Sequence, residues 1–179
     1  MATQARTSKL VCVFLLGISI VFLSACQSSQ NESTNESTST ESAHGHHQDQ
    51  LMTNGDLRQW TASKDELPSF LDEQRDEIKL IYRLAAQEAE LLQSMPCYCG
   101  CGDSAGHKSN LNCFVAQINE KNEIEWDDHG TRCGVCLDIA VEASKLKRDG
   151  KSASDIRKII DNKYNEGFAK PTPTPFPKV

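Results

Sequence analysis

The sequence lacks the features that point to several common classes of function. It has no surplus of basic residues: the formal net charge is −6 at pH 7, which excludes binding to nucleic acid driven by phosphate neutralisation. It has no glycine-rich phosphate loop and no serine–histidine–aspartate arrangement of a hydrolase. With 179 residues, 38% of them hydrophobic, it also excludes a large multidomain enzyme. We therefore expect no enzymatic activity of the hydrolase or transferase type.

The sequence also lacks an apolar run long enough to span a bilayer, which takes about 20 residues. Its longest such run covers residues 10–23 and follows Arg6 and Lys9, as in a secretory signal. The string Leu-Ser-Ala-Cys ending at Cys26 resembles the bacterial lipobox, in which a diacylglyceryl group is attached to the cysteine. We expect residues 1–25 to be a lipoprotein signal peptide and Cys26 to carry the lipid. The protein would then be anchored on the extracytoplasmic face of the cell membrane.

Residues 26–64 are predicted to form a flexible, disordered tether. Residues 27–41 are only Gln, Ser, Asn, Glu and Thr, which cannot bury enough apolar area to offset the entropy of ordering. A histidine cluster follows at His44, His46 and His47. Histidines in a mobile segment can capture metal ions loosely, which we expect as an auxiliary role. The alternative is that they are solvated and have no role.

Hydrophobic periodicity predicts a mainly α domain over residues 65–167, with about four helices and a cysteine-rich loop. The predicted helices cover residues 72–93, 110–120, 133–148 and 154–164, and a brief extended piece covers 124–126. The proline-rich tail, residues 168–179, is predicted to be disordered and to have no role in the core. A core this small is expected to need cross-links or a metal ion.

What the sequence has in abundance is cysteine, eight residues in all. Cys97, Cys99 and Cys101 alternate along a segment whose glycines let the thiols converge on one ion. Cys133 and Cys136 open a predicted helix, whose N-terminal dipole is expected to lower their pKa. Such sulfur ligands from two segments favour a soft-metal site for Cu⁺ or Zn²⁺. The candidate ligands are Cys97, Cys99, Cys101, Cys113, Cys133, Cys136, His107 and His129, with Cys99, Cys101, Cys133 and Cys136 as the first choice.

Two other interpretations of the cysteines stay open. Six cysteines can form three disulfides that staple an exported interaction module without metal. Alternatively, Cys133-Gly-Val-Cys136 resembles a thioredoxin-type redox pair, although the expected βαβ context is missing.

The spacing of Cys99, Cys101, Cys133 and Cys136 also resembles the [2Fe–2S] pattern of bacterioferritin-associated ferredoxins. Export argues against such a cluster, because secreted chains usually cross the membrane without cofactors. Near the second pair, the carboxylates of Asp127 and Asp128 adjoin His129 and either orient it toward a metal or form a polar turn.

The string Pro-Cys-Tyr-Cys-Gly-Cys at residues 96–101 resembles the signature of the PCYCGC-motif proteins. The likeness extends from residues 67–71 through 106–110, 113–114, 127–130 and 133–136 to about residue 157. This resemblance implies a lipid-anchored, surface-exposed protein of Gram-positive bacteria, and it brings no function with it. From the residues we expect copper or zinc handling or delivery, with the membrane and a metal-receiving or redox protein at the cell surface as partners.

Overall fold

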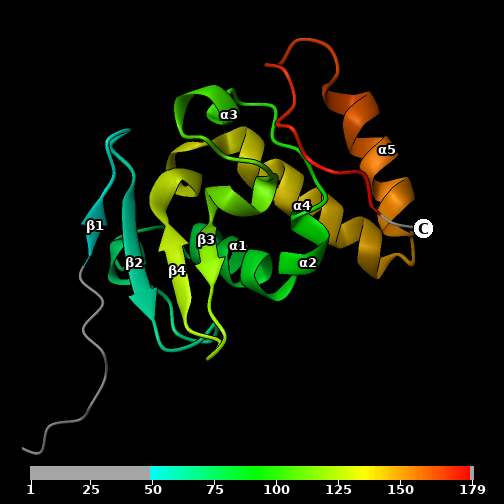
Figure 1. The fold of residues 1–179 in the computed structure, drawn as a ribbon. Helices are drawn as coiled ribbons and strands as arrows, with labels where there is room; N and C mark the ends of the chain where they lie inside the picture. The colour runs from blue at the N-terminus through cyan, green and yellow to red at the C-terminus, as the bar shows by residue number, and fades with distance from the viewer. Residues whose placement is uncertain (1–48, 178–179) are drawn as a thin grey trace, which may run out of the picture. The chain divides into compact units, whose positions relative to one another are not determined.

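The computed structural model of the protein describes residues 49–177, which contain a small antiparallel sheet and five α-helices (Figure 1). The predicted signal peptide, the lipid attachment at Cys26 and the cluster of His44, His46 and His47 lie outside the described residues. Among the residues described, no helix is both long and apolar enough to cross a bilayer.

Four strands form one sheet in the order β1-β2-β4-β3, with every neighbouring pair antiparallel. Their bounds are β1 Gln50–Leu51, β2 Leu57–Thr61, β3 Val115–Ile118 and β4 Ile124–Asp127. Strand β4 is buried along its whole length, and it pairs with β2 in the register Gln59 to Trp126. The sheet therefore joins the beginning of the described chain to a segment more than sixty residues later.

The helices are α1 Asp76–Gln87, α2 Ala89–Leu92, α3 Cys101–Ser104, α4 Gly134–Arg148 and α5 Ala153–Tyr164. Three 3₁₀ turns, η1 Ser69–Leu71, η2 Asn110–Cys113 and η3 Asp128–Arg132, complete the set within residues 49–177. Helix α4 contacts both α1 and α5. The hydroxyl of Ser152 caps α5 by accepting a hydrogen bond from the backbone N–H of Asp155 at 3.1 Å.

The prediction of a mainly α fold with about four helices is wrong, because a four-stranded sheet accompanies five helices. Part of the sheet, β1 and β2, lies in residues assigned to the tether. Another part, β3, lies where a helix was predicted over residues 110–120. There the apolar spacing of Leu111, Phe114 and Ile118 imitates a helical face, but the backbone makes a 3₁₀ turn and then extends.

Three aromatic side chains join the helices to the sheet in the core. Tyr82 of α1 is fully buried, with its ring centroid 5.2 Å from that of Phe114 and 6.2 Å from that of Trp126 in β4. Its hydroxyl donates a hydrogen bond of 2.8 Å to the carbonyl of Asp127. This bond satisfies the buried hydroxyl and fixes the end of β4, from which η3 leads toward the cysteines.

The C-terminal segment, residues 168–177, packs against the cysteine loop. In Figure 1 it runs between α5 and the chain that leads into α3. The N–H of Ala169 donates to the carbonyl of Tyr98 and that of Thr172 to the carbonyl of Cys97, both at 3.0 Å. Arg157 of α5 holds the same segment by donating to the carbonyl of Thr174 at 3.2 Å. The structure thus differs from the expectation of a tail without a role in packing: Thr172 and Thr174 are buried.

Candidate metal centre

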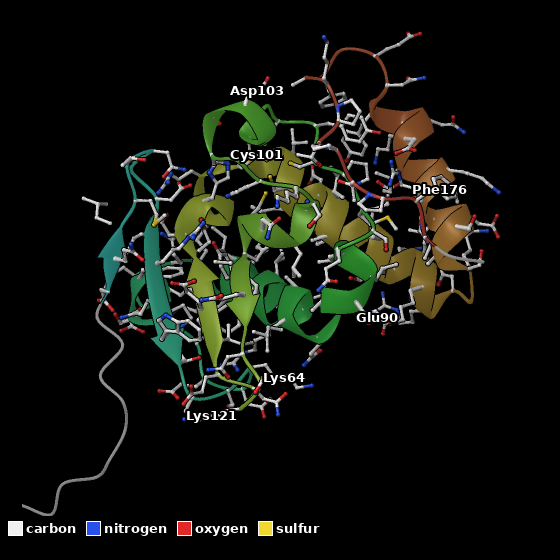
Figure 2. All side chains as sticks on the ribbon, viewed as in Figure 1. Lys64, Glu90, Cys101, Asp103, Lys121 and Phe176 are labelled. Atoms are coloured by element: carbon white, nitrogen blue, oxygen red, sulfur yellow. The ribbon has the colours of Figure 1, made fainter. Side chains whose placement is uncertain are left out.

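The segment with the Pro-Cys-Tyr-Cys-Gly-Cys string, residues 96–101 (the motif), turns sharply between α2 and α3. Gly100 has a φ of +88°, a left-handed conformation that glycine adopts without strain, and it directly precedes α3. Cys101 is the first residue of that helix and is buried, whereas Asp103 of the same helix is exposed; Figure 2 shows the two on opposite sides of it. The turn therefore directs the cysteine side chains inward and leaves the polar ones in solvent.

The sulfur atoms of all six described cysteines lie in one cluster. The Sγ of Cys136, in the first turn of α4, is 3.1 Å from that of Cys97, 3.0 Å from that of Cys113 and 3.1 Å from that of Cys133. It lies 3.6 Å from the Sγ of Cys99. All six cysteines are free. These separations exceed the disulfide length of about 2.05 Å, so residues 49–177 contain a thiol cluster and no disulfide.

Three sets of four side chains in this cluster have ligand atoms within 4.8 Å of one another and could hold a metal ion. We name the sets A, B and C. Set A is Cys97, Cys99, Cys101 and Cys136; set B is Cys99, His129, Cys133 and Cys136; set C is Cys101, His107, Cys113 and His129. Together they contain every cysteine and histidine that the sequence proposed in the domain. The first-choice ligands Cys99, Cys101, Cys133 and Cys136 do not form one set. Set A contains Cys97 in place of Cys133, and Cys133 belongs to set B.

His129 is oriented by a carboxylate from the other end of the described chain. Its Nδ1 is 3.2 Å from both oxygens of Asp56, which also forms an ion pair with Arg132. A carboxylate at one ring nitrogen directs the other nitrogen toward a metal and raises its basicity. The pKa of His129 is raised to about 9 by its hydrogen bond with the Cys99 sulfur and then by Asp56, against the opposing effect of burial.

His107 is almost fully buried and has one nitrogen without a hydrogen bond. Its Nδ1 is 3.5 Å from the Sγ of Cys113, while its Nε2 has no hydrogen-bond partner among the described residues. A carboxylate oxygen of Asp127 lies 3.9 Å from Nε2. The two histidine rings lie 4.8 Å apart, edge to face. Both imidazoles therefore border the sulfur cluster on the side of η3.

Asp127 and Asp128 accept hydrogen bonds from backbone N–H groups and arginine side chains rather than from the ring of His129. Asp127 accepts a hydrogen bond from the backbone N–H of His129 at 3.0 Å and one from Nε of Arg58 at 2.9 Å. Burial raises the pKa of Asp127, and these two bonds oppose the shift. Asp128 accepts from the N–H of Leu57 at 2.9 Å. The group that orients the imidazole is Asp56 instead, in the segment that the sequence assigned to the tether.

The thiols divide into two classes by pKa. A hydrogen bond with Cys101 lowers the pKa of Cys99, and one with Cys113 lowers that of Cys101 to about 2. Hydrogen bonding to Cys101 raises the pKa of Cys113 and of Cys136. The hydrogen bond with Cys136 acts to lower the pKa of Cys133, but Cys99 and burial raise it to about 11. The lowering predicted for Cys133 at the start of α4 is therefore wrong, because a neighbouring thiolate outweighs the helix dipole.

Sequence reasoning missed three residues that position the cluster. They are Asp56, Thr172 and Asn110. The side-chain amide of Asn110 donates to the carbonyl of Cys136 at 3.1 Å, and its backbone N–H donates to Met95 at 2.8 Å. Nothing in the local sequence marks these positions, since each acts on a partner far away along the chain.

Comparison with known proteins finds a family and no characterised relative. A family model described as "Protein of unknown function with PCYCGC motif" matches residues 13–177. No curated protein matches the chain, and no solved structure matches it. A function must therefore be argued from the site.

Proposed function

Because the chain belongs to the family of proteins of unknown function with a PCYCGC motif, we propose its function from the site: it binds soft metal ions through cysteine thiolates. One observation carries this proposal. Six free thiols from three segments of the chain have their sulfur atoms together, flanked by two histidines. Thiolate is the ligand type that selects Cu⁺ and Zn²⁺ over hard cations such as Mg²⁺ and Ca²⁺.

The arrangement favours metal binding over the disulfide alternative. A disulfide scaffold would distribute its cysteines as separate pairs across the fold. Here Cys136 is close to four other sulfur atoms at once, which no pairing scheme requires. Convergence of this kind is what a coordination sphere needs.

We favour copper, with zinc as the second candidate. Four of the six cysteines are buried, and burial among sulfur ligands suits a monovalent soft ion such as Cu⁺. A [2Fe–2S] cluster on Cys99, Cys101, Cys133 and Cys136 receives less support, since these four do not form one set.

The accessible side of the cluster favours handling or delivery of the metal. Cys99, Cys133 and His129 are half-buried, whereas the other three members of sets A and B are buried. An incoming or outgoing ion would therefore meet set B first. We propose that the protein carries its lipid on Cys26, on the extracytoplasmic face of the membrane. There it would exchange metal through set B with a metal-receiving protein.

Thiol–disulfide exchange at Cys133 and Cys136 is the enzymatic alternative. A nucleophilic cysteine of such a pair needs a lowered pKa, so that thiolate is present at neutral pH. Cys136 is as close to the sulfur atoms of Cys97 and Cys113 as to that of Cys133, so the two cysteines do not form the isolated pair that such exchange uses.

Metal content and intact mass test the proposal. The full chain, reduced and then supplied with Cu⁺ or Zn²⁺, is desalted and analysed for bound metal. We expect stoichiometric metal in the wild type and in the control Cys12→Ser, which changes a cysteine of the predicted signal peptide. Cys136→Ser, which makes the same chemical change inside it, should lose most of the metal. Absence of bound metal in the reduced chain, with an intact mass of the chain before reduction that is lower by two hydrogens for each disulfide, would overturn the proposal in favour of a stapled interaction module.

A further inference from the structure

Resting on the proposed function, we infer that the site is polynuclear: it holds two or more metal ions bridged by cysteine sulfur. The inference follows from how the three ligand sets overlap, from how close the sulfur atoms are, and from the charge that the buried thiolates would carry.

No two of the sets are independent of each other. Sets A and B share Cys99 and Cys136, sets A and C share Cys101, and sets B and C share His129. Two ions in any two sets must therefore share a ligand. A thiolate sulfur has lone pairs for two ions, but the remaining nitrogen of His129 has one, because Asp56 occupies Nδ1. The ions consequently occupy set A with B or C, with Cys99, Cys136 or Cys101 as the bridge.

The sulfur spacing leaves thiols that one ion cannot use. Two sulfurs on one tetrahedral Zn²⁺ lie about 3.8 Å apart, from a Zn–S bond of about 2.3 Å. An ion in set A takes four sulfurs, yet Cys113 and Cys133 remain 3.0 and 3.1 Å from the Sγ of Cys136. Each is thus adjacent to a sulfur already bound. A second ion beside the first can bind Cys133 in set B or Cys113 in set C.

The charge of the thiolates also favours more than one metal ion. The four thiolates of set A carry a charge of −4, and one divalent ion there would leave −2 in a cluster whose members are buried or half-buried. Uncompensated charge of that size is not tolerated away from water. The nearby cations do not compensate it: Arg58 pairs with Asp127, and Arg132 pairs with Asp56 and Asp128. Two or three divalent ions, or a larger number of Cu⁺ ions, bring the cluster close to neutral.

Cadmium tests this inference, because Cd²⁺ binds thiolates and its ¹¹³Cd nucleus reports bridging sulfur. The full chain carries Cys12→Ser, Cys26→Ser and glutamine at His44, His46 and His47, so that the domain supplies the ligands. Native mass spectrometry of the reduced protein with Cd²⁺ should show at least two ions per chain. ¹¹³Cd spectra should then show coupling between two cadmium signals through a shared sulfur.

The outcomes separate the inference from the proposed function. A single Cd²⁺ per chain, at saturation and with the fold intact by circular dichroism, would overturn the polynuclear site and keep the metal-binding function. Two uncoupled cadmium signals would overturn the bridging ligands. No bound Cd²⁺ at all would overturn both. Restoring the three histidines should not change the number of ions held by the domain.

Discussion

Replacing Thr172 with valine should loosen the cysteine loop without changing its shape. The hydroxyl of Thr172 accepts a hydrogen bond from the backbone N–H of Cys97 at 2.9 Å. It also lies 2.9 Å from the hydroxyl of Thr174, which donates to the carbonyl of Lys108 at 2.6 Å. Since Thr174 donates its only hydrogen to Lys108, Thr172 donates to Thr174. The hydroxyl of Thr172 thus connects the motif to the C-terminal segment.

Valine fills the same space and removes this connection. The buried N–H of Cys97 then has no acceptor, and leaving a buried donor unsatisfied costs about 1–3 kcal/mol. The folding equilibrium constant of the metal-free protein should fall by about 5- to 150-fold, at about 1.4 kcal/mol per factor of ten. The melting temperature should fall by about 2–8 °C for each kcal/mol lost.

Urea unfolding of the reduced, metal-free protein, followed by far-ultraviolet circular dichroism, measures this change. Thr53→Val is the matched control, because Thr53 lies on an exposed turn, and its free energy of unfolding should change by less than about 0.5 kcal/mol. If Thr172→Val is as stable as this control, the hydroxyl of Thr172 does not hold the motif and the reasoning fails.

Three further predictions use other features of the structure. Gly130→Ala should lower the free energy of unfolding by about 1–3 kcal/mol, because its Cβ would lie 2.7 Å from the buried ring of Phe114. The control Gly134→Ala, whose Cβ would meet open space, should be neutral or stabilising in the same unfolding assay. In the metal-free protein at about pH 6, iodoacetamide should label Cys99 before the equally half-buried Cys133. The lowered pKa of Cys99 makes it a thiolate, whereas the pKa of about 11 keeps Cys133 protonated. Peptide mass spectra that show the reverse order of labelling would refute these pKa assignments. Cadmium affinity should fall between about pH 8 and about pH 6, because the thiols with raised pKa release protons on binding, and a titration with the same affinity at both pH values would contradict this coupling.

The helices with a continuous apolar face could be predicted from the sequence. In α1, Ile78, Ile81 and Tyr82 recur at helical spacing and are buried, as are Ile139 and Ala143 in α4. Tertiary packing preserved this local pattern, so periodicity was sufficient.

The sheet could not be predicted in the same way. Strand β2 contains only two apolar residues, Leu57 and Trp60, and all five of its positions are half-buried, so it shows no alternation. Its partner β4 is distant in the sequence, and pairing at that distance leaves no local signal. The position of Asp56 beside His129 depends on this pairing, which is why the orienting carboxylate was missed.

The site itself was predictable in composition but not in arrangement. Two cysteine-rich segments indicated that their sulfurs meet. Which sulfurs meet depends on backbone turns that only the folded chain shows, such as the one at Gly100 that places Cys101 in α3. The first choice took two cysteines from each segment, whereas set A contains three from the motif and only Cys136 from the second segment.

The hydrogen bond between Thr172 and Cys97 also affects the order in which the parts of the site form during synthesis. A chain emerges from the ribosome N-terminus first, so all six thiols appear before the residues that fix the backbone of the motif. Until residues 169–172 arrive, the cysteine loop lacks the hydrogen bonds that Ala169 and Thr172 make to Tyr98 and Cys97. A chain that ends early has every ligand and lacks the means to keep them in place. A truncation before Thr172 would therefore keep all six thiols and lose the hydrogen bond that fixes the backbone of Cys97.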